Sequence, residues 1–145
     1  MSLIEFKDLP NTDTPINAEN LNHNFNELNK SDNYSREEQV IGTWVSGKPL
    51  YRKVMIFNTS INSDAENKFA HGIENAEFVR IKEAHIYNVS AGYSLPLPVT
   101  LYSSNTSFDH LNIRVDRTYV QFFLETTFGN GWYKVVILEY TKTTD

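Results

Sequence analysis

Apolar residues follow a helical spacing in one short stretch near the start of the chain and a mostly two-residue spacing afterwards. Between Asn17 and about Asn29 the apolar positions lie three, four and three residues apart, so they form one stripe along a helix. Asn17 is a good N-cap for this helix. The apolar stripe consists of Ala18, Leu21, Phe25 and Leu28.

This helix has little stability of its own. Five asparagines within it each cost up to ~0.7 kcal/mol relative to alanine, and helices of about a dozen residues are marginal in water. Burial of Leu21, Phe25 and Leu28 would stabilise the helix by roughly 1.5 to 3 kcal/mol for each side chain. The apolar stripe therefore needs a covering surface, either the rest of the same chain or the same helix in other copies. Its residues fall on successive a and d heptad positions over less than two heptads.

Most of the remaining chain shows strand patterns separated by turn residues at short intervals. A turn at Ser46–Lys48 joins the first two strands, with Gly47 supplying a positive φ. Seven or eight short strands predict a mainly β fold: an antiparallel, jelly-roll-like β-sandwich with a short N-terminal α-helix. The expected strands are Val40–Val45, Pro49–Phe57, Lys68–His71, Phe78–Val89, Val99–Tyr102, Leu111–Val115, Val120–Leu124 and Trp132–Thr141.

The same patterns divide the chain into three parts. Residues 1–30 are expected to form an extended arm and the helix, because Pro10 and Pro15 disfavour helix around them. Residues 31–39 form a polar connector with a short helical turn around Ser35–Glu38. Residues 40–145 form the β-sandwich domain, in which the alternation of Phe78–Val89 changes partway and predicts a bend or bulge.

Composition narrows the class of partner. The formal net charge of −5 gives no field that would attract nucleic acid, so no nucleic-acid partner is expected. The basic residues Lys48, Arg52 and Lys53 are interpreted as a solvated strand face or an interface salt bridge. The chain has no cysteine, no signal-peptide pattern and no run long enough to span a bilayer, so we expect neither disulfides nor membrane insertion.

Motifs that usually mark catalysis are missing from the sequence. There is no G-x-S-x-G, no H-E-x-x-H and no glycine-rich phosphate loop, and the four histidines show no metal-ligand spacing. His71 is expected to shape a strand end, and Asp64–Glu66 to be a solvated loop in preference to a calcium site. Sequence alone leaves open a pair of carboxylates at glycosidase separation. We expect no enzyme, no catalytic residues, no metal and no cofactor.

Aromatic side chains are the remaining candidates for contacts with a ligand or partner. Alternation places Phe57, Phe122 and Leu124 in the core. Tyr93 and Tyr102 flank the proline-rich stretch at 95–98, and Trp132 lies beside a glycine turn. Tyrosine and tryptophan at a rim can stack on sugar rings or anchor a protein interface, so Tyr93, Tyr102 and Trp132 are the candidate contact residues.

Three stretches resemble known proteins as sequence. Phe6–Leu28, Glu37–Val54 and Glu139–Asp145 are similar to small tail and baseplate structural proteins of siphophages that infect Gram-positive bacteria. The resemblance covers both ends of the chain and the first hairpin. It implies a component of the virion that is synthesised in the host cytoplasm.

The resemblance also favours one covering surface for the helix. Such proteins, including the shoulder regions of lactococcal phage receptor-binding proteins, are commonly trimers of β-sandwich domains with N-terminal segments near the axis. We therefore expect a homo-oligomer, as a trimer, with Ala18, Leu21, Phe25 and Leu28 at the interface and with other phage tail proteins as partners. The alternative is a receptor-binding or glycan-binding module for the host cell wall. A cell-wall-degrading enzyme is disfavoured by the missing motifs.

Overall fold

A computed structural model describes residues 18–29, 34–104, 107–125, 128 and 131–145, without the side chains of residues 27–29, 101–104 and 107–109. The described part contains one helix, α1 (Ala18–Asn29), followed by nine strands. The strands are β1 (Gln39–Thr43), β2 (Pro49–Phe57), β3 (Asn67–Ala70), β4 (Ala76–Asn88), β5 (Tyr93–Pro96), β6 (Val99–Ser104), β7 (Ser107–Val115), β8 (Tyr119–Leu124) and β9 (Trp132–Lys142).

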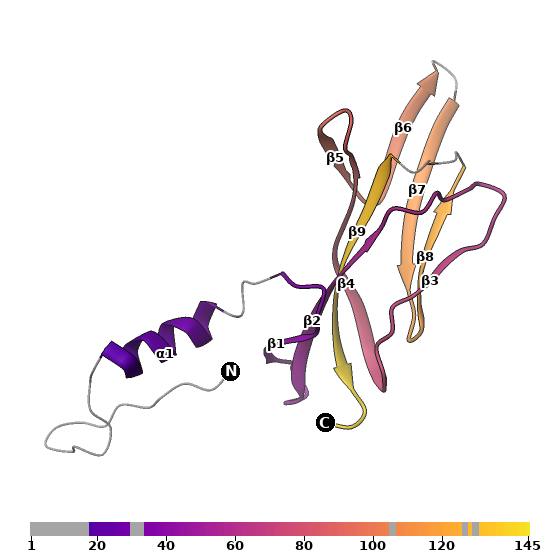
Figure 1. Ribbon diagram of the computed structural model, residues 1–145. Helices are drawn as coiled ribbons and strands as arrows, with labels where there is room; N and C mark the ends of the chain where they lie inside the picture. The colour runs from indigo at the N-terminus through magenta and orange to yellow at the C-terminus, as the bar shows by residue number, and fades with distance from the viewer. Residues whose placement is uncertain (1–17, 30–33, 105–106, 126–127, 129–130) are drawn as a thin grey trace, which may run out of the picture.

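The strands form two antiparallel sheets that pack face to face, which confirms the predicted sandwich. One sheet has five strands in the order β1-β2-β9-β4-β5, and the other has four in the order β3-β8-β7-β6 (Figure 1). The long strand β4 pairs with β9 along nearly its whole length. Its register shifts between Ala76 and Phe78 and between Ile81 and Glu83, so the predicted irregularity in this strand is confirmed.

Alternation of side chains along each strand builds the core between the sheets. Val136, Leu138 and Tyr140 of β9 are fully buried, and Phe122 of β8 faces them from the other sheet. Ile61 and Phe128 lie in loops, where a pair of backbone hydrogen bonds joins them and both side chains enter the core. The predicted core positions Phe57, Phe122 and Leu124 belong to this cluster or pack against it.

Two sequence expectations were wrong. Tyr93–Pro96 forms the additional strand β5, which was not predicted because Pro96 and Pro98 are unfavourable within a sheet. Pro96 is tolerated because it ends a strand at the sheet edge. Residues 35–38 form no helical turn. There the carbonyl of Ser35 accepts a hydrogen bond from Val54 N–H of β2 (2.8 Å), and Glu38 accepts one from Tyr140 Oη (2.7 Å), so tertiary contacts determine the conformation of this segment.

The first hairpin forms where the sequence predicts it. Trp44 N–H donates to Lys48 O and Gly47 N–H donates to Trp44 O, which closes the turn between β1 and β2. Gly47 has φ +86°, the left-handed conformation expected of it. β1 pairs with the first half of β2 only, from Pro49 to Arg52. Among the described strands only β9 pairs with the second half of β2, and on the other side Val54 N–H donates to Ser35 O.

Candidate functional site

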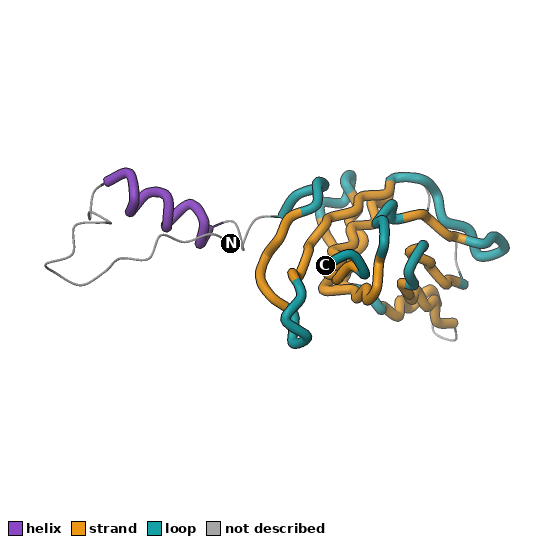
Figure 2. Tube along the Cα trace, turned by 90° about the horizontal axis from the view of Figure 1, so that it is seen from below, coloured by secondary structure: helices purple, strands orange, loops and turns teal. Residues whose placement is uncertain are grey.

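The apolar stripe of α1 is exposed. The side chain of Leu21 is 40% exposed and that of Phe25 is 63% exposed, and Ala18 is exposed as well. The side chain of Leu28 lies outside the described residues. Figures 1 and 2 show α1 to one side of the two sheets, so the sandwich of the same chain does not cover the stripe. Its role as an interface between copies stays a prediction.

Two of the three candidate contact residues lie together at one end of the sandwich. The rings of Tyr93 and Trp132 meet edge to face with centroids 5.6 Å apart, and Trp132 meets Phe128 in the same way at 5.5 Å. Tyr93 is 47% exposed, whereas Trp132 is half-buried against the core. We call these three residues the aromatic rim. Tyr102 pairs with Phe108 through the backbone, but its side chain lies outside the described residues.

A buried lysine lies next to the aromatic rim. Lys134 is fully buried on the core side of β9, and its Nζ donates hydrogen bonds to the carbonyl oxygens of Thr59 (2.5 Å) and Trp132 (2.7 Å). Among the described residues no carboxylate is paired with it, and burial lowers the pKa of Lys134 to about 8. The amine therefore fastens the loop after β2 to β9. Alternation along β9 predicts that Lys134 lies on the core face, but the sequence does not predict which atoms its amine binds.

The outer face of the five-stranded sheet carries an ion pair network that sequence analysis did not identify. Glu139 of β9 is buried between two arginines: its Oε1 accepts from Arg52 Nη2 (2.8 Å) and its Oε2 from Arg80 Nη2 (2.5 Å). Burial alone would raise the pKa of Glu139, but the hydrogen bonds and charges of Arg52 and Arg80 outweigh it and hold this pKa below its usual value. Tyr34 lies over Arg52, and Trp44 lies over Arg80.

This network corrects the interpretation of the basic cluster. Arg52 is buried, not solvated, because Glu139 and the Tyr34 ring cover it. Lys48 pairs with Glu77 beside the end of β9 (2.6 Å), and Lys53 donates to the carbonyl of His71 (3.3 Å). The three basic side chains thus serve contacts within one chain.

His71 follows β3 directly, at the strand end where it was expected, and is buried. Its Nδ1 accepts from Ile73 N–H (3.1 Å), so its Nε2 carries the hydrogen that is donated to Asp116 O (3.1 Å). Within the described ranges, no group of His, Asp and Glu side chains is arranged to hold a metal ion. Over the same ranges, no helix is long and apolar enough to cross a membrane.

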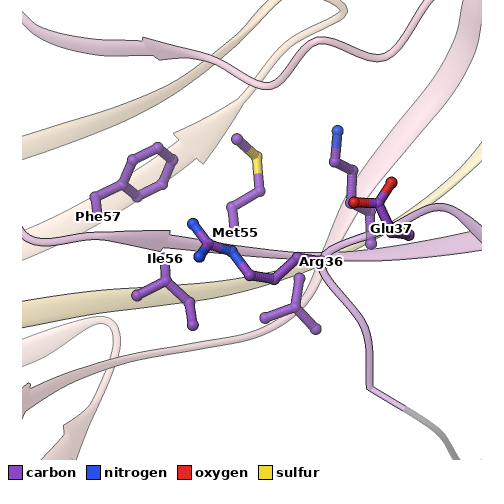
Figure 3. A pocket seen from close by; sticks show the side chains of 7 residues that line it. Arg36, Glu37, Met55, Ile56 and Phe57 are labelled. Atoms are coloured by element: carbon purple, nitrogen blue, oxygen red, sulfur yellow. The ribbon is translucent and has the colours of Figure 1, made fainter.

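A pocket of about 490 Å³ opens beside the second half of β2 (Figure 3). Figure 3 shows Met55 and Phe57 on one side of the strand and Ile56 on the other, with Arg36 in front of them and Glu37 nearby. No salt bridge joins Arg36 or Glu37 to another described residue. Four of the seven lining residues are apolar and three are charged, namely Arg36, Glu37 and Lys53, a mixture that suits contact with a peptide segment. The lining residues are Arg36, Glu37, Lys53, Val54, Met55, Ile56 and Phe57.

Comparison of the chain with protein-family models, with curated proteins and with solved structures gives no match in any of the three. The geometry of these surfaces and the resemblance of the three stretches above therefore carry the functional argument.

Proposed function

We propose that this protein is a non-enzymatic structural component of a phage tail tip or baseplate, which assembles as a homotrimer and docks to other tail proteins. One observation supports assembly above the others: α1 exposes Leu21 and Phe25, and the sandwich of its own chain does not cover them. Assignment to a phage tail is supported by the resemblance of the two ends and the first hairpin.

The low stability of α1 by itself favours its association with the same helix in other copies. A twelve-residue helix rich in asparagine is only marginally stable by itself. The exposed parts of the Leu21 and Phe25 side chains do not stabilise it, because they are not buried. Packing the same stripe from several copies around an axis would bury those side chains in each copy at once. Symmetry also repeats every docking surface of the sandwich, so individually weak contacts gain effective concentration.

Light scattering coupled to size-exclusion chromatography tests the assembly of the native chain and of Phe25→Asp. The native chain should have three times the monomer mass, and the Phe25→Asp variant should dissociate because a charge cannot be buried in the stripe. Asn26→Asp is the matched control: it adds the same charge to an exposed position off the stripe and should stay assembled. A monomeric native chain would overturn the proposed assembly.

A second candidate function is recognition of a host cell-wall glycan or receptor. The aromatic rim favours it, because Tyr93 presents an exposed ring held in place by Trp132. Sedimentation with cell-wall polysaccharide of a Gram-positive bacterium tests this function. Binding that Tyr93→Ala removes would support the rim as the contact site. Tyr87→Ala, which removes a similarly exposed ring from the five-stranded sheet, should leave binding unchanged.

A further inference from the structure

The second half of β2 has an open edge. β1 pairs with β2 only as far as Arg52, while β9 covers the opposite edge from Tyr51 to Phe57. Val54 N–H, which points toward the open side, donates to Ser35 O. Because backbone groups alternate in direction along a strand, the N–H and C=O of Ile56 point the same way. No described residue provides a backbone partner for them.

This open edge, residues 55–57 of β2, has little of the protection usual at sheet edges. Exposed edges are normally blunted by charged residues, proline or bulges, yet β2 ends in four apolar residues in succession. Ile56 is 38% exposed. Lys53, the charged residue of β2 nearest to this edge, donates a hydrogen bond to the carbonyl of His71. The edge is therefore a template on which an extended segment can add as a further strand.

The N-terminal arm of this chain has the sequence that such a strand needs. Residues 1–17 precede α1 outside the described part, and among them Ile4 and Phe6 alternate with Glu5 and Lys7. Residues 3–7 in an extended strand reach about 17 Å at about 3.3 Å per residue, which is enough to span the open edge of β2 at residues 55–57.

Apolar and charged side chains of the arm also suit the two sides of the open edge. Ile4 and Phe6 on one face of an added strand would meet Met55 and Phe57, which line the pocket on the core side of β2. The opposite face of the added strand would then present Glu5 and Lys7, and the pocket lining carries charges of both signs on Arg36, Glu37 and Lys53. Opposite charges on the arm and on the pocket lining can then pair across the contact.

We propose that residues 3–7 of one copy add as a strand to the open edge of β2 in a second copy. This inference rests on the proposed homo-oligomer. α1 follows the arm in the sequence and lies to one side of its own sheets, so association of the helices would bring each arm close to a neighbouring copy (Figure 1). Less than two heptads is a short interface for an oligomer, and exchanged strands would supply the additional contact.

Amide hydrogen exchange measured by NMR on the full chain tests the added strand at one position. Ile56 N–H should exchange at least about tenfold more slowly in the native chain than in the double variant Ile4→Asp/Phe6→Asp. Val54 N–H, bonded to Ser35 O within the chain, should exchange equally in both. The control Ser2→Asp/Asn11→Asp adds the same charge outside the proposed strand and should exchange like the native chain. Equal exchange of Ile56 in the native chain and the first variant would overturn the proposal.

A mixing experiment identifies the copy that supplies the arm. Isotope-labelled Ile4→Asp/Phe6→Asp chains are assembled with an excess of unlabelled native chains, and Ile56 is observed on the labelled chains only. Restored protection shows that the arm comes from another copy. If protection is not restored, the arm acts within its own chain and the proposal is wrong. Masses of the same samples by light scattering separate the two proposals, because an assembled native chain with unprotected Ile56 contradicts only the strand exchange.

Discussion

Glu139 stands directly opposite Arg52 in the β2–β9 ladder and directly opposite Arg80 in the β4–β9 ladder. One carboxylate on the central strand thus joins three strands of the five-stranded sheet, on the face turned away from the core. Both carboxylate oxygens are bonded, and Glu139 is only 2% exposed. Such a pairing fixes the register of β2 and β4 against β9, because a shift of one residue would move the arginines to the opposite face.

Replacing Glu139 by glutamine should destabilise the fold strongly. The variant leaves the buried Arg52 without a counter-charge, and loss of one partner from a buried pair costs about 3–5 kcal/mol. Urea unfolding measures this free energy. Arg80→Gln is the control: the Arg80 side chain is 41% exposed and Glu139 keeps Arg52, so the loss should stay near or below about 1 kcal/mol. Similar losses in the two variants would contradict the assigned network.

Acid should destabilise the native chain in part through the same carboxylate. The pKa of Glu139 in the folded protein is below its usual value of 4.5, so the unfolded chain binds a proton first as pH falls. The stabilisation is complete above 4.5 and is lost as pH falls through the folded-state pKa. Unfolding free energies across this range should decline less steeply in Glu139→Gln than in the native chain. Parallel curves would show that Glu139 contributes nothing to acid sensitivity.

Alkaline conditions should have the opposite effect through Lys134. Its pKa of about 8 in the folded protein is below the ordinary value of 10.5, so between these values the unfolded chain binds more protons. Stability should therefore rise with pH above about 8, by at most about 1.4 kcal/mol per pH unit. Lys134→Met should lack this rise. The comparison is best made below pH 10, the ordinary pKa of tyrosine. Above pH 10 the unfolded chain loses protons from Tyr51 and Tyr140 first, because their pKa values are raised in the folded protein, and the fold is destabilised.

Local sequence patterns were sufficient for most elements of the fold. α1, the hairpin turn at Gly47 and the alternation of β8 and β9 depend on residues close together in the chain, so spacing and turn chemistry predict them. Strand β5 was missed because its four residues are ordered by pairing with β4, a contact that no local pattern records. The segment at 35–38 was misassigned for the same reason, since Val54 and Tyr140 determine its conformation.

The candidate surfaces divide in the same way. Sequence identified the apolar stripe from its helical spacing, and it identified Tyr93 and Trp132 because they lie beside a proline-rich stretch and a glycine turn. Both signals come from residues close together in the chain. Sequence by itself thus determined a mainly β protein with an apolar helix that needs a covering surface. Only the tertiary structure decided that Glu139 joins Arg52 and Arg80, that Lys134 binds the carbonyl oxygen of Thr59, and that β2 has an open edge. These three features depend on strand order and register, which arise from contacts between residues far apart in the chain.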